Sequence, residues 1–64
     1  MRLHVPEMTC GHCVNVLRAA FDRAMPGVAI EIDLALREVR GADGDADRIA
    51  EVVRSAGYEG HVVG

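Results

Sequence analysis

Apolar and polar positions alternate along residues 2–5 and 28–34, with the two-residue period that is typical of half-buried β-strands, and two further short stretches are also predicted to be strands. In the first stretch Leu3 and Val5 share one face, and Pro6 ends the pattern because it has no N–H to donate to a sheet. The third stretch is a poorer strand, because Gly41 and Ala42 stand where strand-forming residues would do better. The predicted strands are residues 2–5, 28–34, 36–42 and 59–63, and the second one should face inward with Ile30, Ile32 and Leu34.

Two longer stretches repeat their apolar residues every three or four positions, which predicts amphipathic helices. The first runs from Gly11 to Met25 and ends at Pro26-Gly27, since proline cannot continue a helix and glycine tolerates left-handed geometry. The second follows an Asp-Gly-Asp turn, with Asp45 placed as its N-cap and Asp47 in its first turn. The predicted inner stripes are Val14, Leu17, Ala20, Phe21 and Ala24 in the first helix, and Ile49, Val52, Val53 and Ala56 in the second, which Gly57 ends.

These elements follow one another in the order β-α-β-β-α-β. That order predicts an α+β, ferredoxin-like sandwich, in which two helices pack on one face of a four-stranded antiparallel sheet. The chain has 64 residues, half of them apolar, and contains no linker or low-complexity segment. We therefore expect a single domain over residues 1–64.

Charge and hydropathy narrow the classes of function. The seven basic residues are all Arg, are scattered along the chain and face ten acids, for a net charge of −3. Nucleic-acid binding needs a basic face, so it is not expected. No apolar run approaches the roughly 20 residues of a membrane span, and the beginning, "MRLHVPE", lacks the apolar core of a signal peptide. We expect a cytoplasmic protein without membrane insertion.

The stretch "MTCGHC", Met8 to Cys13, carries the candidate chemistry. Cys13 falls near the start of the first predicted helix, where backbone N–H groups and the helix dipole favour a thiolate, and Cys10 precedes it in the loop. A thiol of low pKa suits a redox pair and a soft-metal site equally. In a reducing compartment a C-x-x-C pair is more often one of these two than a structural disulfide.

A redox function has one resemblance in its favour. Cys-Gly-His-Cys is the active-site tetrad of the protein disulfide isomerases, which would make the chain a thiol–disulfide oxidoreductase. That family places an aromatic residue before the first cysteine and a proline opposite the pair. Here Thr9 precedes Cys10, and neither Pro6 nor Pro26 is in the required position. The match therefore stops at four residues.

A second resemblance covers the whole chain. The pattern M-x-C-x-x-C from Met8, the amphipathic helix after it, the hairpin around "VAIEIDL", the helix "ADRIAEVVRSAGY" and the last strand "EGHVV" resemble the heavy-metal-associated domain family, in its bacterial copper-chaperone form. The "AGY" at 56–58 is a second, independent match. One departure is Glu7, where the family usually has glycine.

The resemblance implies a carrier of Cu(I) and not an enzyme. Near-linear binding by the thiolates of Cys10 and Cys13 on an exposed loop would leave the ion open to a partner's thiolate. The partner implied is a copper-transporting P-type ATPase. Cu(I) is soft and prefers thiolates, whereas Zn(II) wants four ligands, often with a carboxylate where Thr9 stands. Hg(II) is the closest chemical mimic, so Zn(II) and Hg(II) stay as alternatives.

Four neighbours are expected to tune the site. We expect Met8 to pack beneath the loop as a flexible core residue and not as a thioether ligand. His12 is expected to face solvent and to adjust the thiolates, with direct metal binding as the alternative. Thr9 lies inside the motif, and the resemblance places Tyr58 near the cysteines. Two copies meeting loop to loop would supply four thiolates, so a copper-bridged homodimer with His12 at its rim is also expected.

Overall fold

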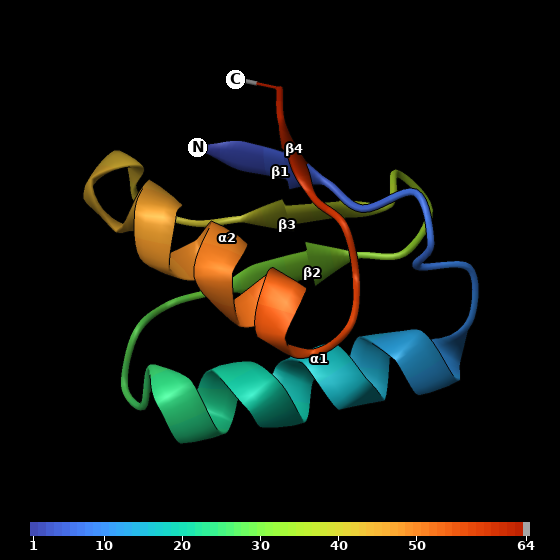
Figure 1. Ribbon diagram of the computed structural model, residues 1–64, viewed down its shortest axis with the longest axis horizontal. Helices are drawn as coiled ribbons and strands as arrows, with labels where there is room; N and C mark the ends of the chain where they lie inside the picture. The colour runs from blue at the N-terminus through green and yellow to red at the C-terminus, as the bar shows by residue number, and fades with distance from the viewer. Residues whose placement is uncertain (64) are drawn as a thin grey trace.

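The computed structural model describes residues 1–63, so Gly64, the last residue of the predicted domain, lies outside the described residues. The elements follow the predicted order (Figure 1). They are β1 (Arg2–His4), α1 (Gly11–Ala24), β2 (Glu31–Asp33), β3 (Glu38–Arg40), a 3-10 turn (Asp43–Asp45), α2 (Ala46–Ser55) and β4 (His61–Val62). Within residues 1–63, no helix has the length and apolar character needed to cross a membrane.

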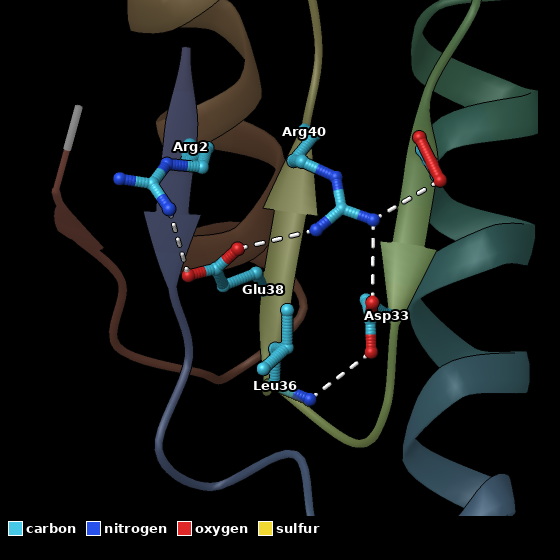
Figure 2. A network of polar contacts seen from close by, with 6 residues as sticks. Arg2, Asp33, Leu36, Glu38 and Arg40 are labelled. Carbon is cyan, nitrogen blue, oxygen red and sulfur yellow. Dashed lines mark hydrogen bonds and ion pairs between the residues drawn. The ribbon is translucent and has the colours of Figure 1, made fainter.

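The four strands form one sheet in the order β2-β3-β1-β4, and each neighbouring pair is antiparallel. Leu3 at the centre of β1 lies opposite Val39 on one side and Val62 on the other. Figure 2 looks onto one face of this sheet and shows both helices behind it. The ferredoxin-like prediction is therefore confirmed, with each helix connecting two parallel strands across a third.

The core lies between the sheet and the helices. It consists of Leu3, Val5, Met8, Leu17, Phe21, Met25, Val39, Ile49, Val52 and Val53. The predicted helical stripes are mostly confirmed, but Ala24 is exposed, and Met25 at the end of α1 is buried instead. The N–H of Met25 still bonds the carbonyl of Phe21 at 2.7 Å, so the last turn brings this longer side chain under the sheet.

All four strands are shorter than predicted, and at the hairpin a turn ends β2 early and delays the start of β3. Asp33 accepts a hydrogen bond from the Leu36 N–H at 3.0 Å, and Arg37 adopts the left-handed conformation at φ 54°. The prediction that Leu34 faces inward is wrong: it lies past the end of β2 and is 39% exposed. A Cβ at Gly41 would lie 2.5 Å from Cδ1 of Ile49, so a larger residue there would require the Ile49 side chain to shift.

The start of α2 differs from its prediction. Asp45 occupies the N-cap position, but its side chain makes no capping hydrogen bond. The residue instead closes a 3-10 turn, in which its N–H bonds the carbonyl of Ala42 at 3.0 Å. Its backbone, at φ −101° and ψ 6°, is not the extended conformation that a capping side chain requires.

The sheet face away from the helices carries a charged cluster (Figure 2). Arg40 contacts Glu31 at 3.0 Å, Asp33 at 3.3 Å and Glu38 at 3.2 Å, and Arg2 reaches Glu38 at 3.7 Å. The Leu36 N–H and, after it, the Arg40 guanidinium lower the pKa of Asp33. These contacts join β1, β2 and β3 and support their register. The cysteine loop begins at the end of β1.

Candidate metal centre

The loop between β1 and α1, residues 5–10, is hydrogen-bonded to the β2–β3 hairpin and packs on the core through Met8. The Val5 N–H bonds the Arg37 carbonyl at 2.7 Å, and the Met8 N–H bonds the Val5 carbonyl at 3.0 Å. The Met8 side chain has 0% of its surface exposed. Met8 thus lies in the core, where a flexible apolar side chain supports the loop.

The two cysteines lie side by side at the start of α1. Cys10 is the N-cap residue in an extended conformation, and Cys13 is in the first helical turn. Their Sγ atoms are 3.6 Å apart, and both are free thiols, Cys10 exposed and Cys13 half-buried. The first turn of α1 holds no acid and has no side-chain cap. The unpaired N–H groups and positive dipole end of this helix therefore remain available to a thiolate.

The surroundings of Cys13 favour its ionised form. The Tyr58 hydroxyl and, after it, the main-chain N–H of Thr9 lower the pKa of the Cys13 thiol. The same contact with Cys13 raises the pKa of Tyr58. Among residues 1–63 the two side chains do not form a hydrogen bond of standard geometry, so the Tyr58 hydroxyl lies near the thiol without bonding it. The main-chain N–H groups that lower this pKa belong to residues before α1, and the Tyr58 hydroxyl has a larger effect than either of them. A contribution of the helix terminus stays a prediction.

The remaining predicted residues are placed less centrally. His12 and Thr9 are exposed, and among the hydrogen bonds within residues 1–63 neither side chain bonds a cysteine. No group of three or more His, Cys, Asp or Glu side chains gathers at one point in residues 1–63. The protein itself therefore offers two sulfur ligands, with Tyr58 beside them and Met8 beneath.

One contact of the site was missed by the sequence reasoning. The Glu7 carboxylate accepts a hydrogen bond from the Glu59 N–H at 2.8 Å, across 52 positions of sequence. The main-chain carbonyl of Glu7 also accepts a 3.7 Å contact from the Cys13 thiol. The only signal in the sequence was Glu7 itself, which stands where the resembling family usually has glycine.

Comparison with known proteins places this arrangement in a family. The protein-family model described as "Heavy-metal-associated domain" matches residues 2–59. The chain belongs to the heavy-metal-associated domain family. The resemblance seen in the sequence is thereby confirmed, and the two thiols occupy the loop that resembles the family's M-x-C-x-x-C motif.

Solved structures share the fold over nearly the whole chain. Atu1203 of Agrobacterium tumefaciens is 43% identical, with a TM-score of 0.78, over 92% of this chain and 94% of its own. A gold binding protein is 26% identical, with a TM-score of 0.82, over 95% of each chain. The copper chaperone Atx1 from Synechocystis PCC6803 is 22% identical, with a TM-score of 0.81, over 95% of this chain and 98% of its own, and it shows likeness of fold alone. A search of the curated proteins found no match.

Proposed function

We propose that this chain is a single-domain Cu(I) metallochaperone of the cytoplasm, which passes copper to a copper-transporting P-type ATPase by thiolate exchange. It acts as a carrier, with the metal as cargo, and not as an enzyme. One observation carries the proposal: two free sulfurs lie 3.6 Å apart at an open helix N-terminus. Membership of the heavy-metal-associated family supports it.

The donor set favours a soft ion of low coordination number. Two thiolates, with no third His, Cys, Asp or Glu beside them in residues 1–63, suit Cu(I) better than Zn(II), which is bound almost always by four ligands. The similarity to a gold binding protein supports soft-metal chemistry at this loop. With a metal–thiolate bond of about 2.3 Å, a linear arrangement needs sulfurs about 4.6 Å apart. The pair would open by about 1 Å, which rotation of the exposed Cys10 side chain allows.

The difference in exposure between the two sulfurs gives the exchange an order. A partner's thiolate reaches an ion held at the exposed end of the site and becomes its third ligand. Cys10 is exposed and Cys13 half-buried, so the bond to Cys10 breaks first, and its thiolate is released to solvent. A second thiolate of the partner then binds the ion and displaces Cys13, which lies beside Tyr58 and leaves last. The ion passes between the proteins without being released.

The test is anaerobic competition among Cu(I), Zn(II) and Hg(II) for the reduced protein, with stoichiometry measured for each ion. We expect tight Cu(I) binding that equimolar Zn(II) does not displace, and transfer of that copper to the isolated metal-binding domain of an ATPase. Preference for Zn(II) would contradict the proposal. Efficient catalysis of thiol–disulfide exchange, without tight metal binding, would instead support the oxidoreductase alternative.

A further inference from the structure

Glu7 connects the two loops that carry the functional side chains. It lies in the turn between β1 and the cysteines, and its Oε1 accepts the Glu59 N–H at 2.8 Å. Glu59 directly follows Tyr58 in the connection from α2 to β4. One side-chain hydrogen bond therefore joins the loop of Cys10 and Cys13 to the loop of Tyr58.

The main chain of Glu7 faces the thiols while its side chain faces the other loop. Its carbonyl oxygen accepts the 3.7 Å contact from the Cys13 thiol. The next residue, Met8, is fully buried and holds this turn against the core. The main chain of Glu7 is thus held beside Cys13, and its exposed carboxylate reaches from there to the Tyr58 loop.

The Tyr58 loop is also anchored to the end of α2. The Tyr58 N–H bonds the Val53 carbonyl at 3.2 Å, and Gly57 turns the chain at φ 94°. Beyond Tyr58 comes Gly60, which packs closely against Leu3, since a Cβ there would lie 2.5 Å from Cδ2 of Leu3. These contacts hold the loop to the helix and the sheet. The Glu7 carboxylate adds a hydrogen bond that joins it to the cysteine loop.

We propose that Glu7 is a positioning residue, whose carboxylate holds the Tyr58 loop over the cysteine loop and thereby keeps the Tyr58 hydroxyl beside the Cys13 sulfur. The inference rests on the proposed function insofar as Cys13 is a copper ligand. Glu7 contributes no ligand and acts through Tyr58. Losing its hydrogen bond should let the Tyr58 hydroxyl move away and change how firmly copper is retained.

Two neutral substitutions separate the hydrogen bond from the charge. Glu7→Gln keeps a carbonyl oxygen that can accept the Glu59 N–H, whereas Glu7→Ala removes it, and both lose the same negative charge. Glu7 is exposed, so both variants should fold. In the metal-free protein, we expect Glu7→Ala to accelerate hydrogen exchange of the Glu59 amide about fivefold relative to Glu7→Gln. The nuclear Overhauser contact between the Tyr58 ring and Cys13 should weaken in the same variant.

The copper measurement uses a double-mutant cycle with Tyr58→Phe. Relative to Glu7→Gln, Glu7→Ala should lose about three- to fivefold in Cu(I) retention against a competing thiol, and the loss should vanish in the Tyr58→Phe background. A merely structural role would give the same loss in both backgrounds and would overturn the inference, as would equal behaviour of the Gln and Ala variants. If wild-type protein fails to bind Cu(I), the proposed function is wrong, and the exchange and Overhauser measurements alone decide the role of Glu7.

Discussion

The two helices begin in different ways, at opposite ends of the molecule (Figure 1). The start of α1 has Cys10 at its N-cap, without a side-chain cap and without an acid in the first turn. The start of α2 follows a turn that contains Asp43 and Asp45, and Asp47 lies in its first turn. One helix N-terminus is thus already supplied with carboxylates, while the other is left to two thiols.

The difference separates what stabilises the fold from what serves the site. Carboxylates near a helix N-terminus stabilise it, because they complement the positive end of the dipole. The same field at α1 favours thiolates, and a carboxylate placed there would compete with them for it. The start of α1 therefore lacks the carboxylates that would stabilise the helix. Such a loss of stability in favour of function is common at functional sites.

Replacing both thiols should have the largest effect. Cys10→Ser/Cys13→Ser should reduce Cu(I) affinity by more than about 100-fold, the upper range for residues that only support a metal ligand. Stability should not fall, because serine is a favoured N-cap and can add about 1 kcal/mol at position 10. Competition with a Cu(I) chelator and thermal unfolding measure the two effects. Tight binding retained by the double variant would contradict the assignment of the ligands.

Copper should also change the oligomeric state. Two copies meeting at their open α1 starts would supply four thiolates, so Cu(I) should produce a dimer from a protein that is a monomer without metal. Anaerobic sedimentation at increasing Cu(I), with and without a competing thiol, measures this. His12→Ala should weaken the dimer if His12 lies at the rim of the interface. A monomer that persists beyond one copper per chain would refute the prediction.

Tyr58 should influence how Cu(I) affinity changes with pH. Tyr58→Phe removes the largest cause that lowers the pKa of Cys13, so that pKa should rise toward its ordinary value of about 8.5. Thiolate absorbance against pH, compared between Cys10→Ser and Cys10→Ser/Tyr58→Phe, tests this. Apparent Cu(I) affinity should fall in the variant at neutral pH, where the thiol must lose a proton, and should match wild type at a pH above both pKa values.

The same shift links the thiol to stability. The pKa of Cys13 is lower in the folded protein than in the unfolded chain, so its ionisation favours folding. That contribution is complete above the unfolded value of about 8.5 and is lost as pH falls through the folded value. Tyr58→Phe should reduce the rise in unfolding free energy across this window. An unchanged pH profile would show that Tyr58 does not act on the thiolate.

Features that rest on interactions between residues near one another in the sequence were easier to predict than features that rest on distant ones. The order of elements and most of the core followed from the strand period of two residues and the helix period of three to four. Both periods arise because each element buries one face. The inward position of Leu34 was wrong, since Asp33 and Arg37 form a turn that periodicity does not show. Asp45 is the N-cap residue as predicted, but its side chain does not cap the helix, because a capping side chain needs an extended backbone that composition does not reveal.

The site was predictable only in part, for the same reason. The spacing of Cys10 and Cys13 over one helical turn brings the sulfurs together, and the family resemblance placed Tyr58 near them. The contact of Glu7 with Glu59 joins residues 52 positions apart, and nothing in the local pattern indicates it. Copper binding by the two thiols stays a prediction.

A smaller effect is expected from placing a carboxylate at the open end. His12→Asp puts an acid in the first turn of α1, where it should add about 0.5 kcal/mol of stability through the dipole. It should weaken Cu(I) binding about two- to fivefold, because an exposed negative charge disfavours the neighbouring thiolates. His12→Asn is the control of similar size without charge. Equal Cu(I) affinity of the Asp and Asn variants would show that the thiolates do not depend on this field.

The smallest effect is expected from removing the acid at the start of the other helix. Asp47→Asn should lower the unfolding free energy by about 0.5 kcal/mol, because an exposed charge in the first turn of α2 loses its interaction with the dipole. Cu(I) affinity should not change, since α2 begins at the end of the molecule away from the thiols. Asp22→Asn is the matched control: it removes the same charge from the last turn of α1, where an acid opposes the dipole, so stability should stay equal or rise slightly. Denaturant unfolding at low and at 1 M salt measures both, and the Asp47 effect should shrink at high salt because exposed charges are screened. If Asp47→Asn weakened copper binding as much as His12→Asp, the two helix starts would not be separate in function.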